Sequence, residues 1–413
     1  MNRKFFGLLG TMAVVASAGF AGQYETDDYT VDVAQIAGTG SLSQSFYAPS
    51  VVRTLDDQYV HLYFMGTHDI NPDPVSDSVY LYRGTNNYTG WNNAYAPHPS
   101  APAQTPSTCT FGCPGRILPN TSSSNTLVND PTRAYGGPNA WRDEQYFTAR
   151  RRVRLLAVRS NTPQTPRDTI YGVSTDGVNF NWYGLVKNHT ATNYGFGWQE
   201  LTIGTTSYWY GLIGYSIPGG ARGVGAIRAT LNLSSTSDIP ITGIQVYTAS
   251  GWQNLPVSTD PSFLWEFPAD NSRHPLDIWP GIRHASLHKY GQGWEVYGAA
   301  VNPNFDIACA CPTTPSPGLN EIVYKVLDIS LAATPDLMFS SASQLPIEAE
   351  TPGNPRCMPG GHAGSRHFPV LLDWVTNHKI LYSATNDPSP QRTGCTTATF
   401  PGQYIVRTFL KTR

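Results

Sequence analysis

Two Arg-His pairs in the second half of the chain combine residue types that could hold an anion. Arg283-His284 and Arg366-His367 each begin a short strand-like run. A guanidinium group can hold a carboxylate or sulfate through two parallel hydrogen bonds. A neutral imidazole can exchange hydrogen bonds with hydroxyl groups or transfer a proton. The pairs therefore favour an acidic ligand rich in hydroxyl groups, such as a uronate. The alternative is that each arginine forms a structural ion pair with a nearby carboxylate.

Two carboxylates and two aromatic residues occupy comparable positions elsewhere in the chain. Asp143 directly follows Arg142, Glu200 follows Trp198 by two residues, and Tyr47 precedes an Ala-Pro step. Carboxyl groups can serve as general acid and base, and aromatic rings offer flat apolar faces to a ligand. Asp143 and Glu200 are thus candidate catalytic residues, and Tyr47 and Trp198 are candidate binding residues. The alternatives are that Asp143 pairs with Arg142 or forms a turn, and that Glu200 is an ordinary ion-pair partner.

These residues stand where short strands are expected to begin. Helical periodicity is nearly absent, and short alternating runs recur between Gly, Pro, Asn and Asp. Hairpins are predicted over 51–64, 286–300 and 368–384, with related runs after Trp198 and near Trp141. Strand starts near residues 47, 142, 198, 284 and 367 give repeats of roughly 55 to 95 residues.

This spacing predicts an all-β fold, a five-bladed β-propeller that ends with strands over 404–410. A large β-sandwich or two smaller β-domains are the alternatives. In a propeller the first strand of each blade lines the central axis, so residues at these strand starts should meet in one pocket. The expected axial residues are Tyr47, Asp143, Trp198, Glu200, Arg283, His284, Arg366 and His367.

The N-terminus has the layout of a secretory signal peptide. Arg3 and Lys4 precede an apolar run over residues 5–20, and small residues near Ala18 and Ala21 suit cleavage. We expect residues 1–21 to be removed and residues 22–413 to form one secreted or periplasmic domain. No later segment reaches the ~18 apolar residues of a spanning helix, so no membrane insertion is predicted.

The overall charge narrows the class of partner. A formal net charge of −2 gives no general attraction to nucleic acid or anionic lipid. The histidines lack the spacing of helical zinc ligands, and the cysteines lack a repeated C-x₂-C pattern. No metal or other cofactor is predicted, and the expected partner is an oligosaccharide or polysaccharide.

Three motifs resemble those of five-bladed propeller glycosidases of the arabinanase, xylosidase and invertase type. They are YAPSVV at 47–52 followed by the strand at 59–64, STDGVNF at 174–180, and GGH at 360–362. The resemblance implies a sugar held between two carboxyl groups, one that protonates the leaving oxygen and one that attacks or activates water. It places Asp143 in the second blade and Glu200 in the third, where that group keeps its acid.

The sequence also departs from the pattern of that group. Ala48 stands where the group has its opening aspartate, and Glu144 replaces the proline of its Arg-Asp-Pro step. Two hypotheses therefore stay open, a glycoside hydrolase or lyase and a non-catalytic glycan-binding propeller. A surface interaction protein is a third.

Six cysteines accompany the export signal: Cys109, Cys113, Cys309, Cys311, Cys357 and Cys395. An even number in an exported chain predicts disulfides, although the sequence does not give their pairing. Thiol titration of the mature protein, unfolded without reductant, should therefore find fewer than six free thiols. Six free thiols would contradict the prediction.

Overall fold

The described part of the chain consists of strands, turns and short connections. The computed structural model describes residues 28–37, 46–66, 78–85, 96–97, 115–143, 152–160, 167–189, 194–216, 222–254, 265–267, 282–290, 293–301, 321–327, 343–346, 366–375, 378–385 and 404–412. These residues contain 23 strands and no helix, so the all-β prediction is confirmed. The described residues hence offer no apolar helix that could cross a membrane.

The strands form five antiparallel sheets, which we number along the chain. Sheet 1 contains β2 (Phe46–Arg53), β3 (Tyr59–Gly66), β4 (Ser78–Thr85), β5 (Ala96–Pro97) and β6 (Gly115–Leu118). Sheet 2 contains β7 (Ala134–Asp143), β8 (Arg152–Ser160), β9 (Arg167–Ser174) and β10 (Asn181–His189). Sheet 3 contains β11 (Tyr194–Ile203), β12 (Thr206–Ser216), β13 (Arg222–Leu231), β14 (Ile241–Thr248), β15 (Gly251–Asn254) and β16 (Trp265–Phe267).

The last two sheets complete the circle. Sheet 4 contains β17 (Ile282–Tyr290), β18 (Gly293–Val301), β19 (Glu321–Leu327) and β20 (Ser343–Pro346). Sheet 5 contains β21 (Arg366–Val375), β22 (His378–Thr385), β23 (Tyr404–Thr412) and the N-terminal strand β1 (Asp28–Ala37). Because β1 pairs with β23, the first strand of the chain becomes the outer strand of the last sheet.

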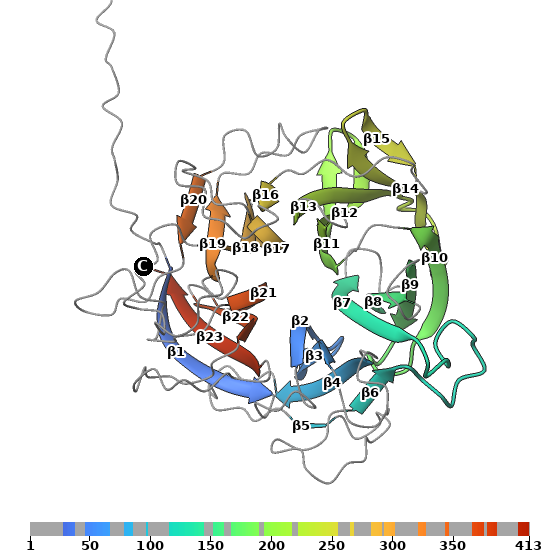
Figure 1. The fold of residues 1–413 in the computed structure, drawn as a ribbon, viewed down its shortest axis with the longest axis horizontal. Coiled ribbons are helices and arrows are strands. Elements are labelled where there is room, and N and C mark those ends of the chain that lie inside the picture. Colours follow the sequence, from blue (N-terminus) through green and yellow to red (C-terminus); the bar gives the residue numbers. More distant parts are fainter. Residues whose placement is uncertain are drawn as a thin grey trace, which may run out of the picture.

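Each sheet presents one end strand to the centre of the molecule. Figure 1 shows β2, β7, β11, β17 and β21 around this centre, and each is the terminal strand of its sheet. We call these five the inner strands. The predicted hairpins at 51–64, 286–300 and 368–384 are confirmed as β2–β3, β17–β18 and β21–β22.

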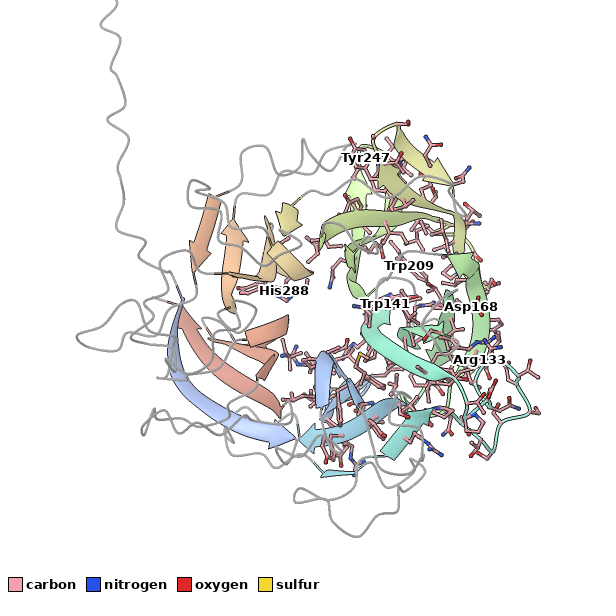
Figure 2. The ribbon with its side chains drawn as sticks, viewed as in Figure 1. Arg133, Trp141, Asp168, Trp209, Tyr247 and His288 are labelled. Atoms are coloured by element: carbon pink, nitrogen blue, oxygen red, sulfur yellow. The ribbon has the colours of Figure 1, made fainter. Side chains whose placement is uncertain are left out.

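Sheets 2 and 3 share an aromatic core. Trp141 and Tyr171 from sheet 2 pack with Trp209 from sheet 3, and the ring centroids of Trp141 and Trp209 lie 5.2 Å apart (Figure 2). Leu156 of β8 contributes from sheet 2, and Ile227 of β13 from sheet 3. Burying a large apolar side chain stabilises the fold by roughly 1.5–3 kcal/mol, so this core fixes the two sheets against each other.

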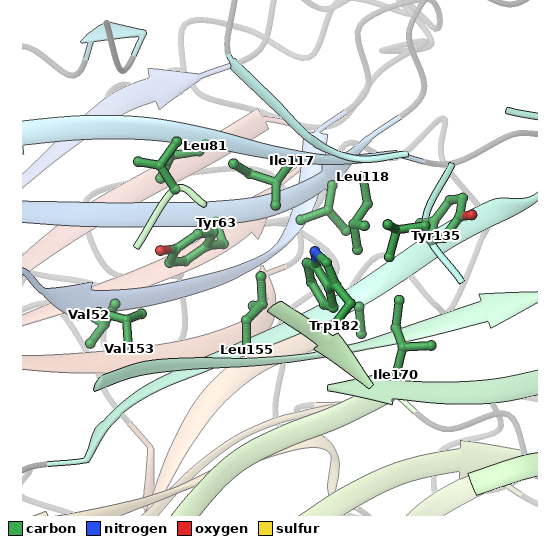
Figure 3. Close-up of a cluster of buried hydrophobic side chains, with 14 residues drawn as sticks. Val52, Tyr63, Leu81, Ile117, Leu118, Tyr135, Val153, Leu155, Ile170 and Trp182 are labelled. Atoms are coloured by element: carbon green, nitrogen blue, oxygen red, sulfur yellow. The ribbon is translucent and has the colours of Figure 1, made fainter. Parts of the chain in front are cut away.

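Sheets 1 and 2 share a second core on the opposite face of sheet 2. Figure 3 shows Tyr63 and Leu81 of sheet 1 facing Leu155 and Trp182 of sheet 2. Successive residues of a strand point to opposite faces. On β8, Leu155 therefore enters this core, whereas its neighbour Leu156 enters the core shared with sheet 3.

The turn between β9 and β10 docks onto sheet 1. Its residue Gly177 has a φ of 73°, which glycine adopts without steric cost, and a Cβ there would collide with His61 and Tyr63. The Tyr63 hydroxyl donates a 2.5 Å hydrogen bond to the Gly177 carbonyl. The STDG motif therefore joins two sheets.

Asp176 organises this turn as an ionised carboxylate. Its oxygens accept hydrogen bonds from the backbone N–H groups of Val178 and Asn179, the Asn179 amide and the Ser174 hydroxyl, at 2.7–2.8 Å. Burial opposes its ionisation, but these bonds outweigh burial and lower the pKa of Asp176 to about 2.

Replacing Asp176 by alanine should lower the free energy of unfolding by about 1–2 kcal/mol at pH 7, because the turn loses several charged hydrogen bonds near solvent. The folded pKa lies below the ordinary 3.8. The contribution is therefore complete above that value and is lost as the pH falls toward 2. Urea unfolding of wild type and Asp176→Ala at pH 7, 4 and 2.5 measures it.

Thr175→Ala, an exposed change in the same turn, is the control and should have little effect. An Asp176→Ala penalty that stays constant from pH 7 to pH 2.5 would contradict the ionised hydrogen-bonding role.

Candidate functional site

All five inner strands are interrupted by a β-bulge two or three residues after they begin. The ladder registers shift between Tyr47 and Ser50, Gly136 and Asn139, Phe196 and Gln199, Arg283 and Ala285, and His367 and Val370. Bulges re-aim side chains and are over-represented next to active sites. We call these five segments the bulge ring, and it is the candidate functional site.

The bulges of β2 and β7 share one backbone form. Ala48 has a φ of 49° and precedes Pro49, and Gly137 has a φ of 56° and precedes Pro138. Glycine adopts this left-handed conformation freely, whereas alanine does so at a cost of about 1–2 kcal/mol. Ala48 is also buried, with 1% of its surface exposed. Strained residues of this kind cluster at functional sites.

Contacts between β2 and β7 show that the two strands run in the same direction. The backbone N–H of Gly137 donates to the Met65 sulfur at 3.2 Å, beside the first bulge. Farther along, the Ala140 N–H donates to the Ser50 hydroxyl at 2.8 Å, and Arg142 donates to the Thr54 carbonyl at 2.8 Å. The bulges of β2 and β7 therefore lie at the same end of these strands.

Asp143 lies at the other end of β7. The sequence-based prediction that this strand begins near Trp141 is wrong, because β7 begins at Ala134. The Gly136-Gly137-Pro138 segment, typical of a turn, forms the bulge instead. Asp143 follows Gly137 by six residues, which is about 20 Å of extended strand.

The partner of Asp143 is Arg154 on β8. Arg154 Nε and Nη2 lie 2.8 Å and 2.5 Å from Asp143 Oδ2, and the exposed fractions of the two side chains are 2% and 8%. Arg142, the neighbour considered from the sequence, pairs with Asp57 instead. Asp143 is thus one half of a buried ion pair, and its Oδ1 accepts no hydrogen bond among the described residues.

Arg154 connects sheets 2 and 3. Its Nη1 donates to the Asp238 carbonyl at 2.7 Å and to the Tyr171 hydroxyl, and its guanidinium carbon lies 5.0 Å from the Trp209 ring centroid. Burial, opposed by the nearby Arg154 charge, raises the pKa of Tyr171 well above 10. Tyr171 therefore stays neutral and donates its proton to the Asp238 carbonyl at 2.7 Å.

Glu200 lies close to the bulge ring, on β11. It occupies the second ladder pair after the bulge, opposite Trp209, and its side chain is partly exposed. Trp209 also contacts Arg154, which holds Asp143. The structure therefore brings Glu200 and Asp143 to the same interface between sheets 2 and 3.

The remaining candidate residues lie in or beside the bulge ring. The backbone of Tyr47 forms the last ladder pair before the β2 bulge, and Trp198 lies within the β11 bulge. Arg283 forms the last pair before the β17 bulge and His284 is the bulged residue. The side chains of these four residues, like those of Arg366 and His367, lie outside the described part of the structure.

The two Arg-His pairs differ by one residue in register. His367, rather than Arg366, forms the last pair before the bulge on β21. Arg283 therefore corresponds to His367 in the ladder, and Arg366 stands one residue earlier. The pairs recur in the sequence but do not occupy equivalent positions.

No group of three or more His, Cys, Asp or Glu residues in the described ranges could hold a metal ion. All six cysteines lie outside these ranges.

Sequence reasoning missed the buried ion pair of Arg154 and the bulge at Gly137-Pro138. The signal for the bulge is the repeated X-Pro step, which occurs at Ala48-Pro49, Gly137-Pro138 and Phe368-Pro369.

Replacing Asp143 by asparagine should lower the free energy of unfolding by about 3 kcal/mol, because the buried Arg154 keeps its charge and loses its counter-ion. Adding Arg154→Met should recover part of this loss, since the uncompensated charge is then removed. Chemical denaturation of the single and double variants measures both effects.

Asp168→Asn is the matched control, since Asp168 pairs with Arg159 of the same sheet at 3.2 Å in a more exposed setting. It should cost less than Asp143→Asn, because the side chains of its pair, 11% and 17% exposed, are closer to solvent than those of Arg154 and Asp143. An equal or smaller loss for Asp143→Asn would show that the buried pair contributes no more to stability than the more exposed one.

Comparisons with known proteins find likeness only among solved structures. No known family model matches the chain, and no curated protein sequence matches it. An α-L-arabinofuranosidase from Lactobacillus brevis is 10% identical, with 92% of each chain covered and a TM-score of 0.45. An endo-arabinase from Bacteroides thetaiotaomicron is 10% identical over 91% of this chain and 96% of its own, with a TM-score of 0.43.

A GH32 β-fructofuranosidase from Bombyx mori is 11% identical, with 93% of this chain and 61% of its own covered and a TM-score of 0.43. These three solved structures carry the names of arabinanase-type and β-fructofuranosidase enzymes.

Proposed function

We propose that the chain is an exported five-bladed β-propeller that binds an oligosaccharide at the bulge ring. The observation that carries the proposal is the recurrence of a bulge at the same place in all five inner strands. Residues 22–413 form the propeller, and residues 1–21 direct its export and are removed. Each of the five sheets is then one blade.

The residue types of the bulge ring support a saccharide as the ligand. Tyr47 and Trp198 supply aromatic faces, Arg283 and Arg366 supply forked donors, and His284 and His367 supply neutral donors and acceptors. Together they suit a ring with many hydroxyl groups and a carboxylate. An acidic sugar is therefore the favoured ligand.

Binding fits the ring better than hydrolysis does. The first two bulges carry Ala48 and Gly137, neither of which has a carboxyl group. Asp143 is bound to Arg154 and its side chain is only 8% exposed, so it is poorly placed to donate a proton to a ligand. Glu200 remains as the one candidate carboxyl group that is partly exposed near the ring. We therefore propose glycan binding as the primary activity.

Hydrolysis is the second candidate, and one observation favours it. Glu200 and Asp143 border the same interface, and Asp143 Oδ1 accepts no hydrogen bond from the described residues. In this mechanism Glu200 protonates the leaving oxygen as its bond to the anomeric carbon breaks. A water molecule adds to that carbon and passes its proton to the Asp143 carboxylate.

Binding is tested with a glycan array followed by calorimetry on wild type and Arg366→Ala. A charged hydrogen bond in a partly desolvated site is worth roughly 1.5–3 kcal/mol, so the variant should bind uronate-containing glycans about 10- to 100-fold more weakly. Neutral glycans should lose less. Arg133→Ala, in a connection outside the ring, is the control. Equal affinity of both proteins for acidic glycans would reject the arginine contact.

Any turnover should fall by a factor of roughly one hundred or more in Glu200→Gln, because that is the usual loss when a general acid is removed. Product release from each glycan bound on the array measures it. Turnover unaffected by Glu200→Gln would exclude Glu200 as the acid, and binding without turnover in wild type identifies a non-catalytic propeller.

A further inference from the structure

Sheet 3 carries a second set of ligand-binding residue types on the face turned away from sheet 2. Trp209 and Ala229 pack toward sheet 2, and residues that alternate with them lie on the other face. Tyr208 on β12 and Arg228 on β13 belong to this second face. They lie apart from the core that sheets 2 and 3 share.

Arg228 is fixed between two aromatic rings. Its guanidinium carbon lies 4.1 Å from the Trp252 ring centroid and 4.6 Å from that of Tyr208. Its Nε donates a 3.0 Å hydrogen bond to Gln245 Oε1. The two rings and the amide hold the planar group in one orientation before any ligand arrives, and such pre-organisation reduces the entropy cost of binding.

Among the residues that the structure describes, no acceptor occupies the terminal nitrogens of Arg228. In the described ranges, Nη1 and Nη2 donate to no protein acceptor and no carboxylate pairs with the guanidinium. Burial lowers the pKa of Arg228 from its ordinary 12.5, partly offset by the nearby tyrosines. A half-buried cation without a counter-ion is complementary to an anionic ligand.

Apolar and amide groups adjoin the guanidinium. Tyr247 packs against Trp252 with ring centroids 5.3 Å apart, and both side chains are partly exposed. The Gln245 amide donates to Asn254 Oδ1 at 3.3 Å, and Asn254 is exposed. Figure 2 shows Tyr247 at the outer end of the sheet, far from the inner strands. Aromatic faces beside amides and a cation suit a sugar ring that bears a carboxylate.

Two of these groups lie on β15, a short strand at the edge of sheet 3. Sheets 2, 4 and 5 each have four described strands, whereas sheet 3 continues from β14 into the short hairpin strand β15. Trp252 and Asn254 both lie on β15. The Trp252 contact with Arg228 therefore depends on β15.

We infer that the Arg228 face of sheet 3 is a second saccharide-binding site that takes an oligosaccharide bearing carboxylate groups, through the fork of Arg228 and the rings beside it. The site rests on the geometry of sheet 3, and the choice of a saccharide as its occupant rests on the proposed function. It lies outside the bulge ring and gives the protein a second contact with a long acidic glycan.

Calorimetry with an oligogalacturonide and with its methyl-esterified, uncharged form tests this site. Arg228→Met keeps the length and apolar area of the side chain but removes the charged fork. We expect the variant to bind the acidic probe at least about 10-fold more weakly at the affected site, with less than about a twofold change for the ester. Arg228→Lys, which keeps the charge but not the fork, should fall between them.

Arg83→Met is the matched control, since Arg83 stacks 4.3 Å from the Tyr59 ring centroid on sheet 1. It should bind both probes as wild type does. Circular dichroism establishes that each variant is folded, and Arg228→Lys decides the question if Arg228→Met is not.

Three results would overturn the inference: no binding of the acidic probe to wild type, equal binding by wild type and the folded Arg228 variants, or equal binding of polyglutamate and the oligogalacturonide. The bulge ring is tested separately by Arg366→Ala. If only Arg366→Ala loses affinity, the bulge-ring site is supported and the Arg228 site is rejected. If only the Arg228 variants lose affinity, the Arg228 site is supported and the bulge-ring site is rejected.

Discussion

The buried guanidinium group of Arg154 is the group on which the contact between sheets 2 and 3 depends. A guanidinium group taken out of water costs several kcal/mol unless its donors are satisfied. Arg154 meets this demand with the Asp143 carboxylate from its own sheet and the Asp238 carbonyl from the next. If the two sheets separated, Arg154 would lose the Asp238 carbonyl and the Trp209 ring, and the apolar core around Trp209 would be exposed to water. Arg154 thereby contacts Trp209, the ladder partner of Glu200.

A buried polar contact also joins sheets 1 and 2, as Arg154 joins sheets 2 and 3, but there both partners are neutral. The connection between β13 and β14 reaches back to sheet 2 through Asp238, which accepts hydrogen bonds from Tyr171 and Tyr183 as well as from Arg154. The turn between β9 and β10 reaches back to sheet 1, where Tyr63 donates to Gly177. In both cases a connection of one sheet docks onto the sheet before it, and a buried tyrosine hydroxyl is the donor. Apolar packing holds the faces together, and these polar contacts set their relative position.

Local patterns in the sequence predicted the strands well where alternation was clear. The β17–β18 and β21–β22 hairpins follow from runs of alternating residues around short turns. The start of β7 was missed because Gly136-Gly137-Pro138 resembles a turn, and only the neighbouring strands show that it is a bulge. The pairing of Asp143 with Arg154 was missed for a related reason. It depends on the ladder register between β7 and β8, whereas adjacency in the sequence favoured Arg142. Contacts between residues distant in sequence decide such features, and a single sequence does not display them.

Ala48 shows that the shape of the bulge ring and its chemistry are separate properties. The left-handed backbone at Ala48 is unfavourable for alanine, yet it persists because the surrounding sheets determine it: β2 is held by its ladder with β3 and by the contact of Ser50 with Ala140. Gly137 adopts the same conformation on β7 without that cost. Neither residue carries a polar side chain, so these two positions contribute backbone geometry to the ring and no carboxyl group. In the proposed binding site, charged side chains are therefore expected from β11, β17 and β21, where Glu200 and the two Arg-His pairs lie, and Tyr47 of β2 adds an aromatic face.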